Sequence, residues 1–379
     1  MRSILGSFLC VCVLAPVVMA CSSDGSSSSA PPPAGAGAAA TAGSGGQSAG
    51  SAGQSAGSAG QSGSGAGTAG SAGTATAELT WSTAAPCPVA RFEANGVVID
   101  GELWVMGGFT AGSLEVTRRV DIYDPVADSW RQGPDLPGAE THIAVVAIGN
   151  DIVVAGGFIG AFTGSRPPPT DTVFRLTAGT TEWTPGPSLP NAGAGFAWAL
   201  VGSELHLAGG LFVDGNTDSQ YHYVWDTAGA DTWSMATELP NPRNHGGGAA
   251  AGGIFYAIGG RHGWDELAGN VANVEAFDPA LGTWTFLAPL PVPRSEIGAS
   301  TSTLSDGRIL VVGGSMNGIT PSDDVYTYQP SEDRWSSLPK LPEKRKGAVA
   351  FQVGDRIVVA TGSPTSTTPS DTTFIGCCL

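Results

Sequence analysis

A short apolar run that ends in two glycines recurs along the chain, and no other feature restricts the fold so strongly. Five copies are complete, and they begin at Leu103, Ile152, Leu205, Ile254 and Ile309. A sixth and weaker copy, IVVATG, begins at Ile357. Glycine at the end of a strand carries a cost in conformational entropy. A chain that repeats this cost six times is predicted to use one supersecondary unit six times.

Other landmarks recur with the same period. Tryptophan returns every 49 to 53 residues, at positions 81, 130, 183, 233, 284 and 335. An aromatic strand comes before most of these tryptophans, and a Leu-Pro pair comes after most of them. Each unit therefore indicates four short strands divided by turns. A period near fifty residues with four strands is typical of one blade of a β-propeller.

The order of glycine pair, aromatic residue, tryptophan and LPxPR resembles the kelch repeat. The resemblance covers about residues 78 to 376 and implies an all-β, six-bladed kelch-type propeller. In that family the glycine pair ends the second strand of a blade, where a bulky side chain would collide with packed aromatic rings. The glycines are therefore expected to be structural, without a chemical role.

The order of the landmarks also predicts how the ring closes. Trp81 precedes the first glycine pair, whereas no tryptophan follows Thr361-Gly362. The segment ELTWST, at residues 78–83, is therefore expected to supply the outermost strand of the sixth blade. The other strands of that blade are expected near 348–352, 356–360 and 371–375. Closure of this kind removes exposed sheet edges, which would otherwise invite aggregation.

The first 77 residues have a different composition. Residues 1–20 join Arg2 to an apolar run, and with Cys21 they resemble a bacterial lipoprotein signal peptide. That resemblance implies lipidation of Cys21 and a lipid-anchored, extracytoplasmic place in the cell envelope, at the outer membrane or cell surface. An ordinary secretory signal is the alternative. Residues 21–77 form a Gly/Ser/Ala linker without large apolar side chains, so they are expected to stay disordered.

Charge and apolar patterning restrict the possible partners. Lys and Arg number 17 against 33 Asp and Glu, which gives a formal net charge of −16. Nonspecific nucleic-acid binding depends on neutralising phosphates, so no nucleic-acid partner is expected. After residue 20 no apolar run approaches the roughly 18 residues of a spanning helix. Membrane contact is therefore expected through the lipid anchor only, and the protein is expected to be a monomer.

Three cysteines remain beyond Cys21: Cys87, Cys377 and Cys378. Cys87 stands where other repeats have the Leu of LPxPR, so it is expected to be a small buried apolar group. A disulfide from Cys87 to Cys377 is not expected, because antiparallel pairing places the end of the last strand beside the start of ELTWST. The pairing state of the three thiols stays open.

The kelch resemblance implies that ligands meet the face formed by two kinds of loop, those between strands two and three and those between blades. Three sets of positions fall on this face. The residues after the glycine pairs are Phe109, Phe158, Leu211, Arg261, Ser315 and Ser363. The arginine positions of LPxxR hold Arg91, Glu140, Gly193, Arg243, Arg294 and Arg345. Two residues further on come Glu93, His142, Gly195, His245, Glu296 and Gly347.

Two interpretations of the arginines remain open. They hold loops through backbone carbonyls and carboxylates, or several converge on an anionic or polyhydroxyl ligand through their bidentate donor forks. The predicted ligand-binding set is Arg243, His245, Arg261, His262, Trp264, Arg294 and Glu296. Its tryptophan offers a ring on which a sugar can stack. Its histidines, with ordinary pKa values, are expected to strengthen binding at mildly acid pH.

The same face also admits enzymatic alternatives. The fold is similar to that of the bacterial sialic acid mutarotases, in which case Arg243 would act with Glu296 or Glu266. Copper radical oxidases of the galactose oxidase type are not favoured, because no suitable Tyr, Cys and His set stands out. Asp214, Asp218 and His222 resemble the iron motif of plant specifier proteins, and such ligands suit non-haem iron. A solvated loop is the other account of that spacing.

The favoured prediction is a surface-tethered binding or scaffolding module that presents a propeller face to a protein or glycan ligand. No catalytic residue, cofactor or metal site is assigned. The alternative is an extracytoplasmic kelch enzyme, either a sialic acid mutarotase-like epimerase or a metal-dependent lyase-like protein.

Overall fold

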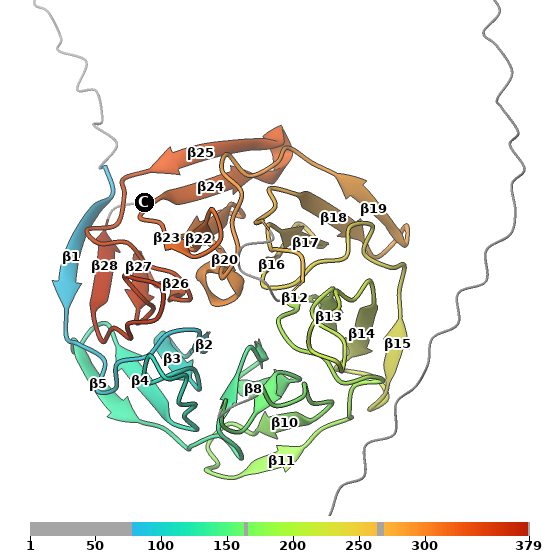
Figure 1. Cartoon of the computed structure of the whole chain (residues 1–379), viewed down its shortest axis with the longest axis horizontal. Helices are drawn as coiled ribbons and strands as arrows, with labels where there is room; N and C mark the ends of the chain where they lie inside the picture. The colour runs from blue at the N-terminus through green and yellow to red at the C-terminus, as the bar shows by residue number, and fades with distance from the viewer. Residues whose placement is uncertain (1–77, 163–165, 264–268, 378–379) are drawn as a thin grey trace, which may run out of the picture. The chain divides into compact units, whose positions relative to one another are not determined.

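The computed structural model describes residues 78–162, 166–263 and 269–377. The predicted signal peptide, the linker, Cys21, Trp264, Glu266 and Cys378 lie outside these ranges. The described chain forms six four-stranded antiparallel sheets placed around a ring (Figure 1). The predicted six-bladed propeller is confirmed.

Blades one to three each follow the chain from the channel outward. Blade one comprises β2 (Asn95–Ile99), β3 (Glu102–Met106), β4 (Val120–Asp124) and β5 (Ser129–Gln132). Blade two comprises β7 (Ala144–Ile148), β8 (Asp151–Ala155), β10 (Val173–Leu176) and β11 (Trp183–Pro185). Blade three comprises β12 (Ala197–Val201), β13 (Glu204–Ala208), β14 (His222–Asp226) and β15 (Trp233–Met235).

Blades four and five repeat this order. Blade four comprises β16 (Gly247–Ala251), β17 (Ile254–Ile258), β18 (Val274–Asp278) and β19 (Thr283–Phe286). Blade five comprises β20 (Thr301–Thr303), β21 (Ile309–Val312), β24 (Val325–Gln329) and β25 (Arg334–Leu338). The only helices among the described residues are the 3-10 turns η1 (Gly298–Ser300) and η2 (Pro330–Glu332). Neither these turns nor any other described segment forms a helix that is long and apolar enough to cross a membrane.

Blade six joins the two ends of the described chain. Its strands are β26 (Val349–Val353), β27 (Arg356–Ala360), β28 (Thr373–Cys377) and β1 (Thr80–Ala84). β1 pairs antiparallel with β28, from Thr80 opposite Cys377 to Ala84 opposite Thr373. Closure by an N-terminal strand is confirmed, although β28 begins two residues later than predicted. Cys87 is buried, and its amide bonds to Asp371 O near the other end of β28 from Cys377, as the strand pairing predicted.

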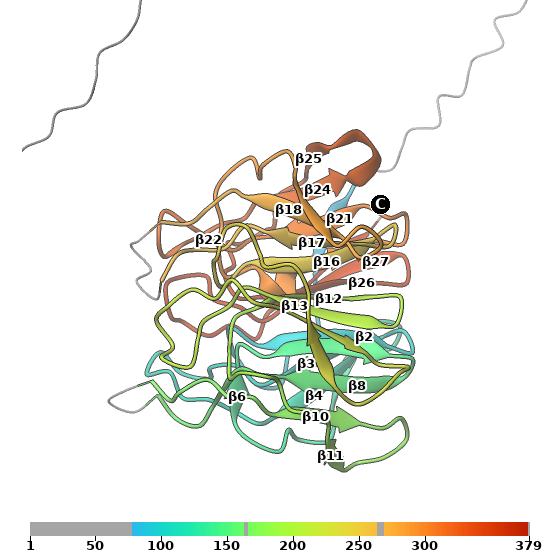
Figure 2. The same ribbon diagram turned by 90° about the vertical axis from the view of Figure 1, so that its right-hand side faces the viewer.

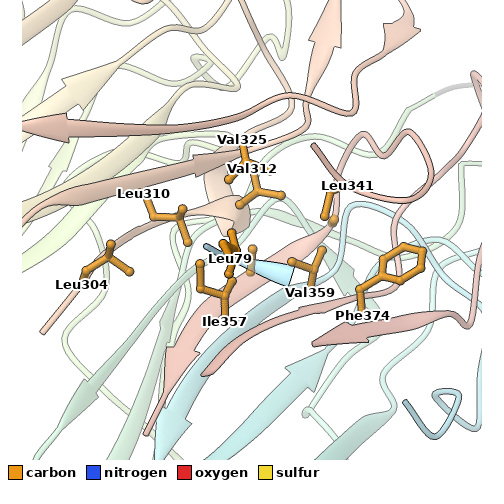
Figure 3. Packing of buried hydrophobic residues seen from close by; sticks show 11 residues of the cluster. Leu79, Leu304, Leu310, Val312, Val325, Leu341, Ile357, Val359 and Phe374 are labelled. Atoms are coloured by element: carbon orange, nitrogen blue, oxygen red, sulfur yellow. The ribbon is translucent and has the colours of Figure 1, made fainter. Parts of the chain in front are cut away.

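Apolar side chains of neighbouring blades pack against one another. Figure 3 shows this packing between blades five and six, where residues of β21 and β24 meet residues of β27 and β28. Leu79, which directly precedes β1, is 4% exposed and belongs to the same cluster. Full burial of one such side chain contributes about 1.5–3 kcal/mol. The closing segment is therefore held by packing as well as by strand pairing.

The glycine pairs lock each blade to the next. Gly259 has a φ of +58°, and a Cβ there would lie 2.7 Å from the carbonyl oxygen of Arg294 in blade five. The next amide, Gly260 N, donates to that same carbonyl at 2.6 Å. An equivalent bond joins blade six to blade one, from Gly362 N to Arg91 O at 2.8 Å. The structural role is confirmed. At Gly259 the obstacle to a side chain is the backbone of the next blade, whereas at Gly156 and Gly210 the ring of Phe196 also lies within 2.9 Å of such a Cβ.

The two kinds of loop share one face, as the resemblance implied. The short strand β6 (Glu140–Thr141) lies in an inter-blade loop and pairs with β9 (Phe158–Ile159). In blade five, β22 (Ser315–Met316) pairs with β23 (Thr320–Pro321) between the second and third strands. Figure 2 shows β6 and β22 on the same side of the ring. We call this side the loop face.

Candidate functional site

The arginines of the LPxxR positions lie inside the blades. Arg243 is 4% exposed; it donates from Nε to Gly259 O at 2.6 Å and forms an ion pair with Glu275. Arg294 is fully buried and donates from Nη1 to Gly313 O at 2.9 Å. Both guanidinium groups thus fill the loop-holding role, and neither lines the small cavity of the channel. Their predicted part in ligand binding has no contact in the structure to support it.

The blades without this arginine have also lost its acid. In blade one Arg91 pairs with Asp121, which lies opposite Val105 in the sheet. The equivalent residues of blades two and three are Phe174 and Tyr223. In blades five and six, which keep the arginine, this sheet position holds Tyr326 and Phe374, and the arginines pair with Asp324 and Glu343 instead. The arginine therefore forms a pair with an acid at this sheet position only in blades one and four. We call Arg91, Arg243, Arg294 and Arg345 the clamp arginines.

Two residues after the clamp position, each blade contributes one residue to a ring at the channel. This channel ring consists of Glu93, His142, Gly195, His245, Glu296 and Gly347. All six have a positive φ, between 51° and 67°. A left-handed backbone costs a residue other than glycine roughly 1–2 kcal/mol. Glycine would suit every position, yet four carry an ionisable side chain, and strained positions of this kind cluster at functional sites.

Blades one and two supply a Glu–His pair to the ring. His142 Nε2 lies 3.2 Å from Glu93 Oε2, and Lys346 Nζ lies 3.8 Å from Glu93 Oε1. The imidazole of His142 meets that of His245 edge-on, with ring centroids 4.7 Å apart. The lysine and both histidines are almost completely buried. One ionic network therefore links blades one, two, four and six.

Arg261 completes this network from the loop after β17. Its Nη1 lies 2.9 Å from Glu296 Oε1, and its Nη2 lies 3.1 Å from His245 Nε2. The Arg261 side chain is 2% exposed and that of Glu296 is 3% exposed. Asn244 Oδ1 bonds to the other ring nitrogen of His245 and fixes the orientation of the imidazole. The structure thus brings together three of the predicted site residues: His245, Arg261 and Glu296.

The two carboxyl groups of the ring have very different pKa values. Burial opposes ionisation of Glu93, but the hydrogen bond and charge of His142, with the charge of Lys346, outweigh it and lower the pKa of Glu93 to about 2. Burial, together with the negative charge of Glu93, raises the pKa of Glu296 to about 7. Glu93 is therefore an anion at neutral pH, whereas Glu296 is about half protonated.

His245 does not have the ordinary pKa that the sequence suggested. Burial, with the positive charges of Arg261 and His142, holds the pKa of His245 well below its usual value. The imidazole stays neutral at mildly acid pH. The expectation that His245 strengthens binding there by gaining charge is therefore wrong, and Glu296 is the group that titrates in that range.

A small cavity lies under the channel ring. Its volume is about 40 Å³, and it is lined by Glu93, His142, His245, Glu296 and Trp198 among others. Such a volume holds about three water molecules. The indole of Trp198 donates to Val145 O at 2.9 Å and also borders a wider cavity of about 290 Å³, which has no charged lining residue. Trp198 thus separates a polar end of the channel from an apolar end.

Aromatic side chains flank the ring on the side of blades one and two. The Phe109 ring lies 5.0 Å from that of Phe162, and the His142 ring lies 5.3 Å from that of Phe158. Arg166 lies 5.5 Å above the Phe158 ring. The site therefore has an aromatic side and a charged side.

His142, His245 and Glu296 could in principle hold a metal ion. One ligand atom from each lies within 4.8 Å of the others, and two histidines with one glutamate are a set that zinc accepts. However, the guanidinium group of Arg261 contacts two of the three residues. Its positive charge takes the place that a cation would fill. We therefore interpret the cluster as an ionic network, not as a metal centre.

The iron-like spacing does not gather its three residues. Asp214 caps its own turn by accepting from Asn216 N and Thr217 N, both at 2.9 Å. Asp218 instead accepts from Gly263 N of the next blade at 3.0 Å. His222 is fully buried in β14 and bonds to another histidine. The solvated-loop account fits Asp214, and an iron site is not supported.

The remaining predicted residues are less central. The His262 side chain is 52% exposed on the loop face, and its Nδ1 lies 3.1 Å from Asp218 Oδ2. Glu93, His142 and Lys346 were not chosen from the sequence, although they belong to the network. The repeat alignment could have identified them. Glu93 and His142 share a repeat position with His245 and Glu296, and Lys346 directly precedes Gly347 of the ring.

Comparisons with known proteins agree with this architecture. The family model described as the KLHDC2/KLHL20/DRC7 Kelch-repeats domain matches residues 141–362, and a Kelch motif matches residues 90–137. The kelch-like protein terF of Aspergillus terreus is 29% identical over 265 residues, which are 66% of this chain and 56% of that protein. A kelch repeat-containing protein of Arabidopsis thaliana is 26% identical, with 72% and 68% covered.

A third relative, kelch-like protein 26 of Danio rerio, is 26% identical over 66% of this chain and 40% of its own length. The chain thus spans about half the length of the fungal relative and less of the zebrafish one. Fold and repeats together define a six-bladed β-propeller. The chain belongs to the kelch-repeat family, whose propellers typically act as protein-interaction modules.

Proposed function

We propose that this propeller is a binding module whose loop face takes an acidic segment of a protein partner, with the channel ring and Arg261 at the centre of the site. The observation that carries the proposal is the left-handed backbone of the ring, at which four of six positions hold Glu or His instead of glycine. A purely structural ring would avoid that strain. The side chains themselves are therefore the selected feature.

The charge of the site favours an anionic ligand. Arg261 and Lys346 bring two positive charges, against the one carboxylate of Glu93 and the half-protonated Glu296. Arg166, which lies above the Phe158 ring, adds a further positive charge that acts on the site. The chain as a whole carries −16, so this centre contrasts with its surroundings and attracts a carboxylate.

The loop face also offers apolar contacts around this centre. Val213 and Ile319, in the loops of blades three and five, are 62% and 37% exposed. Phe162 of blade two is half-buried against Phe158. Scattered apolar groups around a charged centre resemble the composition of protein interfaces more than that of a sugar site. A protein partner is therefore favoured over the glycan that the sequence left open.

The proposed place of action rests on the sequence. Lipidation of Cys21 and a flexible segment at residues 22–77 would tether the propeller to the cell envelope and leave its loop face accessible. Metabolic labelling with an alkyne fatty acid tests this part: native protein should be labelled, and a Cys21→Ser variant should not.

Binding is tested with arrays of peptides that contain Asp and Glu, printed beside the same peptides with Asn and Gln. The propeller should bind acidic peptides and lose binding to their amide counterparts. The variant Arg261→Met should bind neither set. Equal binding of acidic and amide peptides by the native protein would contradict the proposal. A parallel array of acidic glycans, with preferential binding there, would assign the site to carbohydrate instead.

A second candidate function follows from the opposite pKa shifts of Glu93 and Glu296. A carboxylate and a neutral carboxyl side by side can act as base and acid, as an epimerase requires. Arg243, which the mutarotase resemblance invoked, is bound inside its blade, so Arg261 would have to replace it. NMR of anomer exchange in added sialic acid tests this function, and native protein that leaves the exchange rate unchanged excludes it.

A further inference from the structure

Arg261 is already paired with Glu296 of its own chain, and a ligand must displace this pairing to bind. The inference drawn from this pairing rests on the proposed function. We propose that Glu296 competes with the ligand for Arg261. Ionised Glu296 pairs with the guanidinium group of Arg261, and it releases that group to an incoming ligand carboxylate when it takes up a proton. Binding of an acidic ligand would then be coupled to proton uptake by the site.

Glu296 and a ligand carboxylate cannot both pair with Arg261. Glu296 Oε1 already lies 2.9 Å from Arg261 Nη1, and both side chains are at most 3% exposed. A ligand carboxylate that pairs with Arg261 must use the same donor fork. Ionised Glu296 would then lie beside the ligand's charge in a buried site, where like charges repel strongly. Protonation removes that repulsion and turns Glu296 into a hydrogen-bond donor.

Two of the ionisable groups near Glu296 keep their charge state in the relevant pH range. Glu93 stays an anion because its pKa is about 2, and His245 stays neutral because its pKa is well below the usual value. Lys346 and Arg166, from blades six and two, contribute to the field at the site as cations. His142 also faces both carboxyl groups, and every variant used in the test retains it, so that a difference between variants is not due to His142.

The size of the pH effect on affinity follows from the fraction of protein in which Glu296 is protonated. We call this protonated form competent, because its Arg261 can pair with the ligand. The apparent dissociation constant equals the intrinsic one divided by that fraction. With the pKa of Glu296 at about 7, nearly all sites are competent at pH 6 and about one in thirty at pH 8.5. Affinity should therefore fall by about 30-fold between these pH values. The carboxylate of the ligand is ionised throughout.

The test uses two probes, acetate and an N-acetylated, C-amidated tetraglutamate peptide, titrated at pH 6 and pH 8.5 and followed by NMR of the Arg261 side chain. Native protein should bind about 30-fold more weakly at pH 8.5. Glu296→Gln should bind equally at both, and about 30-fold more tightly than native protein at pH 8.5. Binding of acetate alone would indicate a small acid as the ligand, whereas tighter binding of the peptide would indicate a protein segment.

A matched control is available in blade two. Glu140 is 2% exposed and its pKa is also raised by burial to about 7, but it stands at a clamp position and not in the ring. Glu140→Gln should keep the native pH dependence. If it abolishes that dependence, or if Glu296→Gln retains it, Glu296 is not the competitor and the inference is wrong.

A measurement without any ligand separates this inference from the proposed function. The carboxyl carbon of Glu296 should titrate near pH 7, and Arg261→Met should raise that value because a neighbouring positive charge is lost. An ordinary value near 4 would overturn the inference alone. Absence of binding by both native protein and Glu296→Gln, at every pH, would overturn the proposed function together with it.

Discussion

Two positions of the repeat, only two residues apart, have opposite roles. The clamp arginines point into their own blades. Arg243 is held there by a carbonyl oxygen and the buried Glu275, and Arg294 by a carbonyl oxygen and Asp324. The channel ring lies at the central cavity, where its side chains bond across blades. The clamp keeps ordinary backbone geometry, whereas every ring residue has a positive φ. An ionisable residue on the loop face thus bonds within its own blade or across blades according to its place in the repeat, not its chemistry.

The largest expected effect belongs to the clamp. Arg243→Ala would leave Glu275 charged and buried, and loss of one partner of a buried ion pair costs about 3–5 kcal/mol. Urea denaturation should show a decrease of this size in the free energy of unfolding. The double variant Arg243→Leu with Glu275→Phe, which replaces the acid by the residue type found in blade two, should lose clearly less. If single and double variants are equally stable, the clamp is not a coupled unit.

A buried histidine pair gives the next largest effect. His206 Nδ1 lies 2.9 Å from His222 Nε2, and burial lowers their pKa values to about 4 and about 3. The native state keeps both neutral, while the unfolded chain takes up protons below its usual pKa near 6.5. Stability is therefore complete above pH 6.5 and decreases as the pH falls toward 4, by at most about 1.4 kcal/mol per pH unit for each histidine.

The check is the pH dependence of the free energy of unfolding between pH 6.5 and 4.5. The double variant His206→Phe with His222→Phe should have a visibly flatter profile than native protein over this range. A profile of unchanged slope would show that the pair titrates alike in both states.

Ring substitutions should affect stability less than clamp substitutions. Glu93→Gly relieves a left-handed backbone, worth roughly 1–2 kcal/mol, but loses the bonds to His142 and Lys346. The relief of the backbone offsets part of the cost of losing a buried ion-pair partner, so the free energy of unfolding should decrease by about 1–3 kcal/mol, less than for Arg243→Ala. A decrease above about 3 kcal/mol in urea denaturation would place the ring with the clamp as a structural device.

The fold could be predicted from the sequence because the repeat fixes it. Each glycine pair marks a backbone contact between blades, and the surplus tryptophan Trp81 revealed the closing strand. The site could be predicted only in part. Arg243 and Arg261 look alike in the sequence, and only the packing shows that Glu275 neutralises the first inside a blade while the second reaches the ring. The pKa values of Glu93 and Glu296 likewise depend on neighbours from other blades.

The smallest effect is expected on the rim. The His262 side chain is half exposed, and its imidazole contacts the carboxylate of Asp218 from the loop of blade three. His262→Ala should change the free energy of unfolding by no more than about 0.5 kcal/mol, as surface substitutions usually do. A larger loss would show that the contact between the loops of blades three and four stabilises the ring.

The most direct test of the central claim compares two arginines of the loop face in one binding measurement. Arg261 is buried in the ring network, whereas the Arg118 side chain is 57% exposed in the loop after β3. The tetraglutamate peptide is titrated at pH 6 into native protein, Arg261→Met and Arg118→Met by calorimetry. The account predicts at least about a 30-fold loss of affinity for Arg261→Met, the equivalent of 2 kcal/mol, and less than twofold for Arg118→Met. Equal affinities of all three folded proteins would contradict it.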